Sequence, residues 1–248
     1  MNLQSPKKFK MMVDQAHEVA LNVLRPISRK YDKAEHAYPK ELDMLASLID
    51  GMNEGGEGIN AGAAVGKRGE TETGNKNGNN MSTALGIIEM CYGDTGLLLS
   101  MPRQGLGNSA IAAVANDEQL ERFKGTWAAM AITEPGCGSD SAAIRTTATQ
   151  DGDEYILNGE KIFVTSGDRA DSVVVWATLD KKLGRAAIKS FVVPKGTAGM
   201  KVERLEHKLG IKASDTAVIS FIDCRVPAAN LGVVSGNGKY STLRIFTP

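Results

Sequence analysis

The stretch DGDEYILNGEKIFVT, residues 151–165, decides the fold class that the sequence predicts. Asp151-Gly152 is a turn signal between two runs of alternating residues. Asn158-Gly159 is the pair most favoured in a two-residue hairpin, because both central positions of that turn need positive φ. The apolar runs EYIL and KIFVT, on either side of Asn158-Gly159, therefore predict two short strands joined by a tight turn.

More strands are predicted on both sides of this stretch. IRTTATQ alternates upstream, and four further β-type segments follow downstream at short, even spacing: SVVVWATL (172–179), IKSFVVP (188–194), MKVERL (200–205) and AVISFID (217–223). A series of strands joined by tight turns is typical of a small antiparallel barrel or sandwich. We therefore predict such a barrel over residues 126–232.

The chain before residue 125 has a helical period instead. Apolar residues from Met12 to Ile27 recur at steps of three and four, the spacing of one buried helix face. Residues 51–80 are rich in Gly and Asn, which cannot bury apolar area, so they predict a flexible loop. The predicted fold class is α+β and multidomain: a helical domain over 1–125, the barrel over 126–232, and an atypical tail over 233–248.

Composition excludes several functional classes. The 248 residues carry 29 basic and 29 acidic side chains, so a general nucleic-acid binder is not expected. No segment approaches the roughly 20 apolar residues of a membrane span, and the N-terminus lacks the apolar core of a secretory signal. The three cysteines form no C-x-x-C pair, which favours a reducing compartment, and we expect a cytoplasmic protein. Three widely separated histidines, His17, His36 and His207, predict no metal site.

A glycine-rich segment, AITEPGCGSD (131–140), offers the first candidate binding chemistry. Gly136 and Gly138 allow a ligand to approach the backbone, whose N–H groups can hold phosphate oxygens, and Ser139 adds a hydroxyl donor. The alternative interpretation is a strand-to-loop turn with Asp140 as a cap. The residues alone leave both interpretations open.

The segment KIFVTSG (161–167) offers the second candidate. Phe163 and Thr165 stand two residues apart on a predicted strand and so point to the same face. A ring and a hydroxyl on one face suit a flat conjugated ligand. The alternative is a buried Phe163 next to a Thr165 that faces solvent or bonds the backbone.

Together these segments resemble the acyl-CoA dehydrogenase family. AITEPGCGSD, followed by DEYILNGEKIFVTSGDRAD (153–171), resembles the family's middle-domain signature, and KLGIKASDTAVISFIDCRVPAANLG (208–232) resembles the end of that domain. Upstream, QGLGNSAI (104–111) and DEQLERF (117–123) look like the last helices of the family's N-terminal domain. The resemblance is continuous from about Ser82 to Gly232.

The resemblance implies a flavoprotein of fatty acid β-oxidation, an oxidoreductase that takes hydrogen from the α and β carbons of an acyl-CoA thioester and passes hydride to FAD. In this family FAD lies between the barrel and a C-terminal helical bundle. The matching positions imply that Ser139 also binds the substrate's CoA portion. Those implied to bind the cofactor are Met130, Ala131, Ile132, Thr133, Gly136, Gly138, Ser139, Phe163, Val164 and Thr165. The family often has Trp where this chain has Phe163.

The sequence departs from the family after Gly232, where it reads VVSGNGKYSTLRIFTP. The family's bundle, with its catalytic glutamate and most of its homo-oligomer interface, would follow here, so no catalytic residue is predicted. We expect an incomplete FAD-dependent acyl-CoA dehydrogenase. Two alternatives stay open: a non-catalytic remnant that binds flavin or acyl-CoA, and one subunit of a hetero-oligomer whose partner supplies the bundle.

Overall fold

The computed structural model describes residues 7–54, 79–103 and 105–232. Their contacts divide them into two compact units. The helical unit comprises 7–54, 79–102 and a later segment, His207–Ser214. The β unit comprises the described residues of Arg103–Glu206 and those from Asp215 onward. The predicted tail 233–248 lies outside the described residues.

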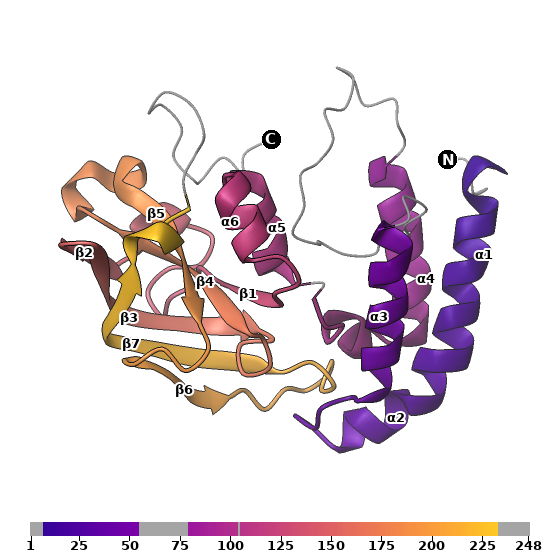
Figure 1. Cartoon of the computed structure of the whole chain (residues 1–248). Coiled ribbons are helices and arrows are strands. Elements are labelled where there is room, and N and C mark those ends of the chain that lie inside the picture. Colours follow the sequence, from indigo (N-terminus) through magenta and orange to yellow (C-terminus); the bar gives the residue numbers. More distant parts are fainter. Residues whose placement is uncertain (1–6, 55–78, 104, 233–248) are drawn as a thin grey trace. The chain divides into compact units, whose positions relative to one another are not determined.

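The helical unit confirms the helical period of the first part of the chain. In Figure 1, α1 (Lys10–Val19) and α4 (Asn79–Leu99) lie side by side, and α3 (Glu41–Glu54) packs near them. Between α1 and α2 (Arg25–Lys33) the chain forms one π-helical turn, Ala20–Leu24, after the 3-10 turn Lys7–Phe9 that precedes α1. The buried core of the unit includes Leu24, Leu42, Leu97 and Ala213, the last from the segment His207–Ser214.

Two local features of this unit differ from simple helices. Asp94 interrupts α4 with extended backbone angles, φ −173° and ψ 121°, and its Oδ1 accepts a hydrogen bond from Leu97 N at 2.8 Å, which caps the second part. The predicted loop 51–80 begins and ends in helix, since residues 51–54 belong to α3 and 79–80 to α4. Residues 55–78 lie outside the described part of the chain.

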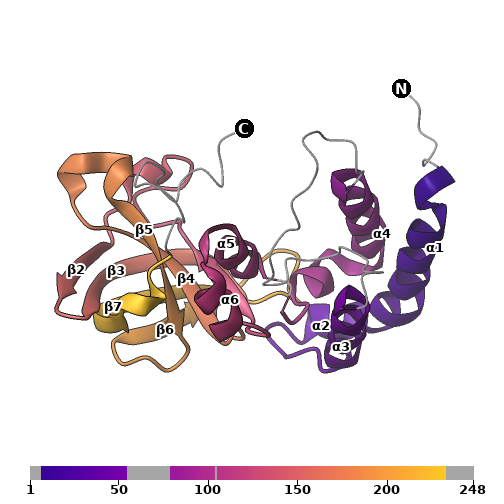
Figure 2. The same ribbon diagram turned by 45° about the horizontal axis from the view of Figure 1, so that its top comes forward.

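The β unit holds a seven-stranded sheet with the order β1-β4-β2-β3-β7-β6, and β5 pairs with β4. The sheet curls on itself, as the orange and yellow strands of Figures 1 and 2 show. Its strands are β1 (Ala128–Ala131), β2 (Thr147–Asp151), β3 (Glu154–Thr165), β4 (Ser172–Thr178), β5 (Ile188–Pro194), β6 (Met200–Leu205) and β7 (Thr216–Pro227). The 3-10 turns Ser141–Ala143 and Lys181–Ala187 lie between strands, and another, Ala228–Asn230, follows β7.

The prediction of an antiparallel barrel is correct only in part. β1 pairs with β4 in parallel, from Ala128 opposite Ser172 to Ala131 opposite Val175. β2 also meets β4 in parallel, through Thr147 and Thr178. The sheet is therefore a mixed half-barrel. Short hairpin connections can make only antiparallel neighbours, whereas β1 and β4 are far apart in the chain and can pair in either direction.

The predicted hairpin at Asn158-Gly159 is wrong. β3 runs unbroken through both residues, and the tight turn lies instead at Gly152-Asp153, where Asp151 pairs with Glu154. Gly159 is needed for another reason: a Cβ there would lie 2.4 Å from Thr146 Oγ1. The Asn158 side chain bonds Asp223 on the neighbouring strand rather than forming a turn.

Two apolar cores cover the two faces of the sheet. The concave face buries Leu157, Val164, Phe191 and Phe221. The other face of β4 and β5 packs against α5 (Leu106–Val114) and α6 (Asp117–Arg122), which lie next to each other in Figure 2. By their contacts, these two helices therefore belong to the β unit. The predicted boundary at residue 125 marks where the helices end and the strands begin. No helix in the described ranges is long and apolar enough to cross a membrane.

Candidate functional site

The fold brings the two candidate segments together inside the β unit. The end of β1 continues into Ile132 and Thr133, and the Thr133 carbonyl accepts a hydrogen bond from Ile162 N at 2.9 Å. Ile162 immediately precedes Phe163 on β3. The segment 130–139 and the segment 163–165 are therefore neighbours in space, although 24 to 35 positions separate their residues in the sequence.

A tight turn follows Thr133. Glu134 N donates to Cys137 O at 2.9 Å, and Cys137 N donates back to Glu134 O at 3.1 Å, so Pro135 and Gly136 form the tip. Gly136 and Gly138 are exposed, and a Cβ at either would meet no protein atom closer than 3.9 Å. Neither has the positive φ that would require glycine, so neither the backbone conformation nor the packing of the chain requires glycine at these two positions.

Phe163 is presented by a β-bulge. Lys161 pairs with Ile219 and Val164 with Ala217, so β3 contains one extra residue between these pairs. Phe163 has φ 58° and is 61% exposed, whereas Val164 is fully buried. A bulge of this kind turns a side chain away from the alternation of its strand. The interpretation of Phe163 as a buried core residue is therefore wrong, and its ring is available on the surface of the β unit.

A buried ion pair holds the turn against β3. The Glu134 carboxylate accepts hydrogen bonds from Lys161 Nζ at 2.8 Å, from Arg145 N at 2.7 Å and from Thr146 N and Oγ1 at 2.9 and 2.6 Å. Lys161 Nζ also donates to Ile132 O at 3.0 Å. One carboxylate and one ammonium thus fix the backbone before the turn, the turn itself and the chain after it.

The electrostatics of this pair follow from its burial. Burial acts to raise the pKa of Glu134, but the charge of Lys161 and the hydrogen bonds from Lys161, Thr146 and Arg145 outweigh it, and the pKa is lowered. Burial lowers the pKa of Lys161, and the attraction of Glu134 offsets only part of that effect. Glu134 is therefore ionised at neutral pH and saturated with donors, which makes it a structural carboxylate rather than a proton acceptor.

A second buried pair fixes the loop after Thr165. Asp215 Oδ1 lies 3.3 Å from Arg169 Nε, and both side chains are almost fully buried. The Asp215 carboxylate also accepts from Asp168 N at 3.1 Å, and its carbonyl accepts from Ser166 N at 3.1 Å. Burial raises the pKa of Asp215 in spite of the Arg169 charge. The loop 166–171 is thus anchored to the start of β7.

Sequence reasoning did not find these two pairs. A signal for Lys161 existed: it follows the alternation of the inward-facing Tyr155 and Leu157, and a lysine directed into a core needs a buried carboxylate. No signal in the sequence linked Asp215 to Arg169, because their contact depends on how β3 and β7 pair.

Comparisons with known proteins show which family the chain resembles. Residues 129–224 match the family described as acyl-CoA dehydrogenase, middle domain. An acryloyl-CoA reductase (NADH) of Anaerotignum propionicum is 32% identical over 96% of this chain and 59% of its own length. A short-chain specific acyl-CoA dehydrogenase of Clostridium acetobutylicum is 30% identical over 96% of this chain and 61% of its own. The chain belongs to the acyl-CoA dehydrogenase family.

Solved structures of the family share the fold. Butyryl-CoA dehydrogenase from Megasphaera elsdenii matches with a TM-score of 0.76 and 28% identity, over 96% of this chain and 61% of that one. A glutaryl-CoA dehydrogenase from Mycobacterium smegmatis, determined in complex with FADH2, shares the fold with a TM-score of 0.74 and 24% identity, over 94% of this chain and 57% of that one. This acyl-CoA dehydrogenase family member spans about 60% of the length of the relatives it matches.

The residues expected to bind a flavin in this family differ in burial here. Phe163, Gly136, Gly138 and Ser139 are exposed, whereas Ala131 and Val164 are fully buried and can offer only backbone groups. Half-buried side chains lie between them: Met130, Ile132, Thr133 and Thr165. An exposed aromatic ring, exposed glycines and a hydroxyl are residue types that a flat, phosphate-bearing cofactor can use.

Proposed function

We propose that this chain binds FAD on its β unit and takes part in the α,β-dehydrogenation of an acyl-CoA thioester. The hydrogen bond between Ile162 N and Thr133 O carries the proposal, because it joins the glycine-rich turn to the exposed Phe163. FAD, when bound, supplies hydride acceptance, and the protein supplies orientation and exclusion of water.

The roles of the chain's own residues follow from their exposure. Phe163 offers a ring face for stacking, and Ser139 offers a hydroxyl to the cofactor and to the CoA part of the substrate. Glu134 and Lys161 keep the two segments in register and do not touch the reacting atoms. Removal of a thioester α proton needs a free carboxylate placed against the carbon. Glu134, already the acceptor of several hydrogen bonds, does not provide it.

A second candidate function is binding of flavin and acyl-CoA with the base supplied by another protein segment or by a partner. Glu134 favours this candidate, because its carboxylate already accepts hydrogen bonds from Arg145, Thr146 and Lys161 and is not free to accept a substrate proton. Both candidates share the flavin site, and they differ in whether this chain alone can reduce its flavin.

Flavin binding is tested by titrating the chain with FAD and following the quenching of flavin fluorescence. We expect saturable binding that Phe163→Ala weakens by up to about tenfold, since aromatic stacking contributes about 0.5–1.5 kcal/mol. Ile222→Ala is the matched control, because Ile222 is an apolar residue of the same unit with a similar exposure, 67%. Equal affinity of all three proteins, or no saturable binding, contradicts the site.

Dehydrogenation is tested by adding butyryl-CoA anaerobically to the flavin-loaded chain and recording the flavin absorbance. We expect no bleaching at the rate of a complete enzyme, because no base is assigned in this chain; that result would favour the second candidate. Rapid bleaching would show that the chain does contain the base, and would eliminate the second candidate.

A further inference from the structure

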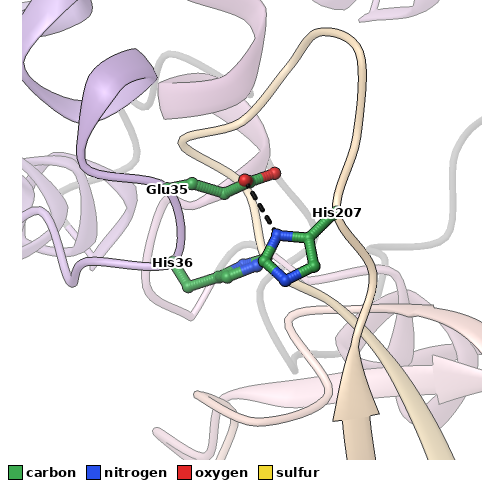
Figure 3. A group of neighbouring side chains, drawn as sticks. All are labelled: Glu35, His36 and His207. Atoms are coloured by element: carbon green, nitrogen blue, oxygen red, sulfur yellow. Dashed lines mark hydrogen bonds and ion pairs between the residues drawn. The ribbon is translucent and has the colours of Figure 1, made fainter.

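A cluster of two histidines and one glutamate lies in the helical unit. Glu35 and His36 stand in the turn between α2 and α3, and His207 begins the segment His207–Ser214, which follows β6 and belongs to the helical unit by contact. Figure 3 shows the Glu35 carboxylate and both imidazole rings directed toward one another. Each of the three offers a ligand atom, and these atoms lie within 4.8 Å of one another.

Glu35 is oriented by its neighbours. Its Oε1 accepts a hydrogen bond from Lys208 N at 2.9 Å, and its Oε2 lies 3.1 Å from His207 Nδ1. These two contacts hold the carboxylate in one direction, as a metal ligand must be.

His36 is the feature that a simple ion pair does not explain. Both of its ring nitrogens are buried, and neither has a hydrogen-bond partner among the described residues. Its backbone takes a left-handed φ of 68°, which is uncommon outside glycine. A buried polar group without a partner is costly in a native protein and calls for an explanation. His17 and Glu89 show the contrast: they also form a histidine–glutamate pair, at 2.7 Å, and no second histidine joins them.

We propose that Glu35, His36 and His207 form a binding site for a divalent transition-metal ion of the Zn²⁺ class. Imidazole nitrogens with one carboxylate suit Zn²⁺ and its neighbours, whereas Ca²⁺ and Mg²⁺ prefer oxygen ligands alone. Metal–ligand bonds of about 2.1 Å in a tetrahedral site place ligand atoms roughly 3.4 Å apart. Small side-chain rotations bring the three residues to that spacing, and solvent completes the coordination.

The ion would link two segments that are distant in sequence. It would join the turn after α2 to His207–Ser214, a segment that the bond from Ser100 Oγ to Ala213 O, at 2.9 Å, also holds to the helices. Lys212 is close enough to Glu35 to interact with its charge, and this positive charge repels a metal cation bound there. The His207 side chain is also 84% exposed. We therefore expect a site weaker than a buried structural zinc site, which acts by stabilising this connection.

The test is calorimetric titration of the metal-free full chain with Zn²⁺, followed by Co²⁺ absorption spectroscopy. We expect one equivalent to bind, with the Co²⁺ spectrum of a site without thiolate ligands. His36→Asn, which keeps a residue that tolerates left-handed backbone, and His207→Gln should each weaken binding by roughly 100-fold or more, beyond the effect of losing an outer-shell partner. His17→Gln is the matched control and should bind as the parent chain does.

Imidazole NMR gives a readout that does not depend on the variants' folding. The chain has three histidines, so each ring can be followed separately. Addition of Zn²⁺ should shift the resonances of His36 and His207 and leave those of His17 in place. The proposal is overturned if the parent chain binds no Zn²⁺, if the two site variants bind as tightly as the parent, or if the His17 ring shifts instead.

Discussion

Replacing Lys161 by Met tests whether the buried pair with Glu134 holds the segments 130–139 and 163–165 together. Lys161 is completely buried, and its loss removes the bonds to Glu134 Oε1 and Ile132 O. The substitution leaves a buried carboxylate with backbone and hydroxyl donors but no countercharge. Breaking a buried pair by removing one partner costs about 3–5 kcal/mol of unfolding free energy. A variant with both Lys161→Met and Glu134→Gln should be more stable than the single variant, because the amide carries no charge.

The assay is urea unfolding followed by tryptophan fluorescence. The chain's two tryptophans, Trp127 and Trp176, are both buried in the β unit, so they report on the unit that contains the pair. With a urea m-value of about 2 kcal/mol/M, a loss of about 4 kcal/mol lowers the midpoint by about 2 M. A loss below about 1 kcal/mol, or a double variant no more stable than Lys161→Met, refutes the reasoning.

The pH dependence of the unfolding free energy gives a second test of this buried pair, and the direction of the expected change follows from the pKa of Glu134. The pKa of Glu134 is lowered in the folded state, so its contribution to stability is present above the unfolded value of about 4.3 and is lost as the pH falls through the folded pKa. In Lys161→Met, burial without the countercharge raises the pKa of Glu134. The variant should therefore recover stability relative to the parent as the pH falls from neutral toward 4. An unchanged difference between the two proteins across this range contradicts the assignment.

Three further predictions concern the two units. Burial raises the pKa of Cys224 to about 11, so iodoacetamide at about pH 8 should modify half-buried Cys91 in the native protein and spare Cys224 until the chain unfolds, as mass spectrometry would show. Phe191→Ala should cost about 3–5 kcal/mol by urea unfolding, because the ring is fully buried; exposed Ile222→Ala is the control and should change stability by less than about 0.5 kcal/mol. Gly107→Ala places a Cβ 2.3 Å from Ala129 O and should cost about 1–3 kcal/mol in thermal unfolding; a neutral result would show that α5 can move away from β1.

The sequence predicted where strands lie better than how they pair. Alternation and turn residues located the segments that became β2 to β7, and β6 matches its prediction residue for residue. Pairing direction is a non-local property, which is why the parallel contact between β1 and β4 was not foreseen. Asn158-Gly159 misled for a related reason: Gly159 serves the close approach of Thr146, and a local pattern cannot distinguish that need from a turn.

The candidate site also combines features that the sequence predicts with features that depend on how the strands pair. Glycines, a hydroxyl and an aromatic residue were visible as motifs, but the exposure of Phe163 depends on a bulge set by the register of β3 and β7. The histidines are widely separated in the sequence, and the sequence therefore predicts no metal site; it does not show which of them the fold brings together. The fold places His36 and His207 with ring centroids 5.3 Å apart.

The parallel contact of β1 with β4 also orders the folding of the β unit. The β2–β3 and β4–β5 connections close short loops, so their entropic cost is small and they can form early. Ala128 must find Ser172 across the chain that contains the β2–β3 hairpin, a long-range contact that forms slowly. β1, the strand that leads into the glycine-rich turn, is thus expected to dock after these two hairpins have formed, as is β7, whose pairing with β3 is also long-range. A newly synthesised chain would complete its hairpins before the glycine-rich turn reaches its place against β3.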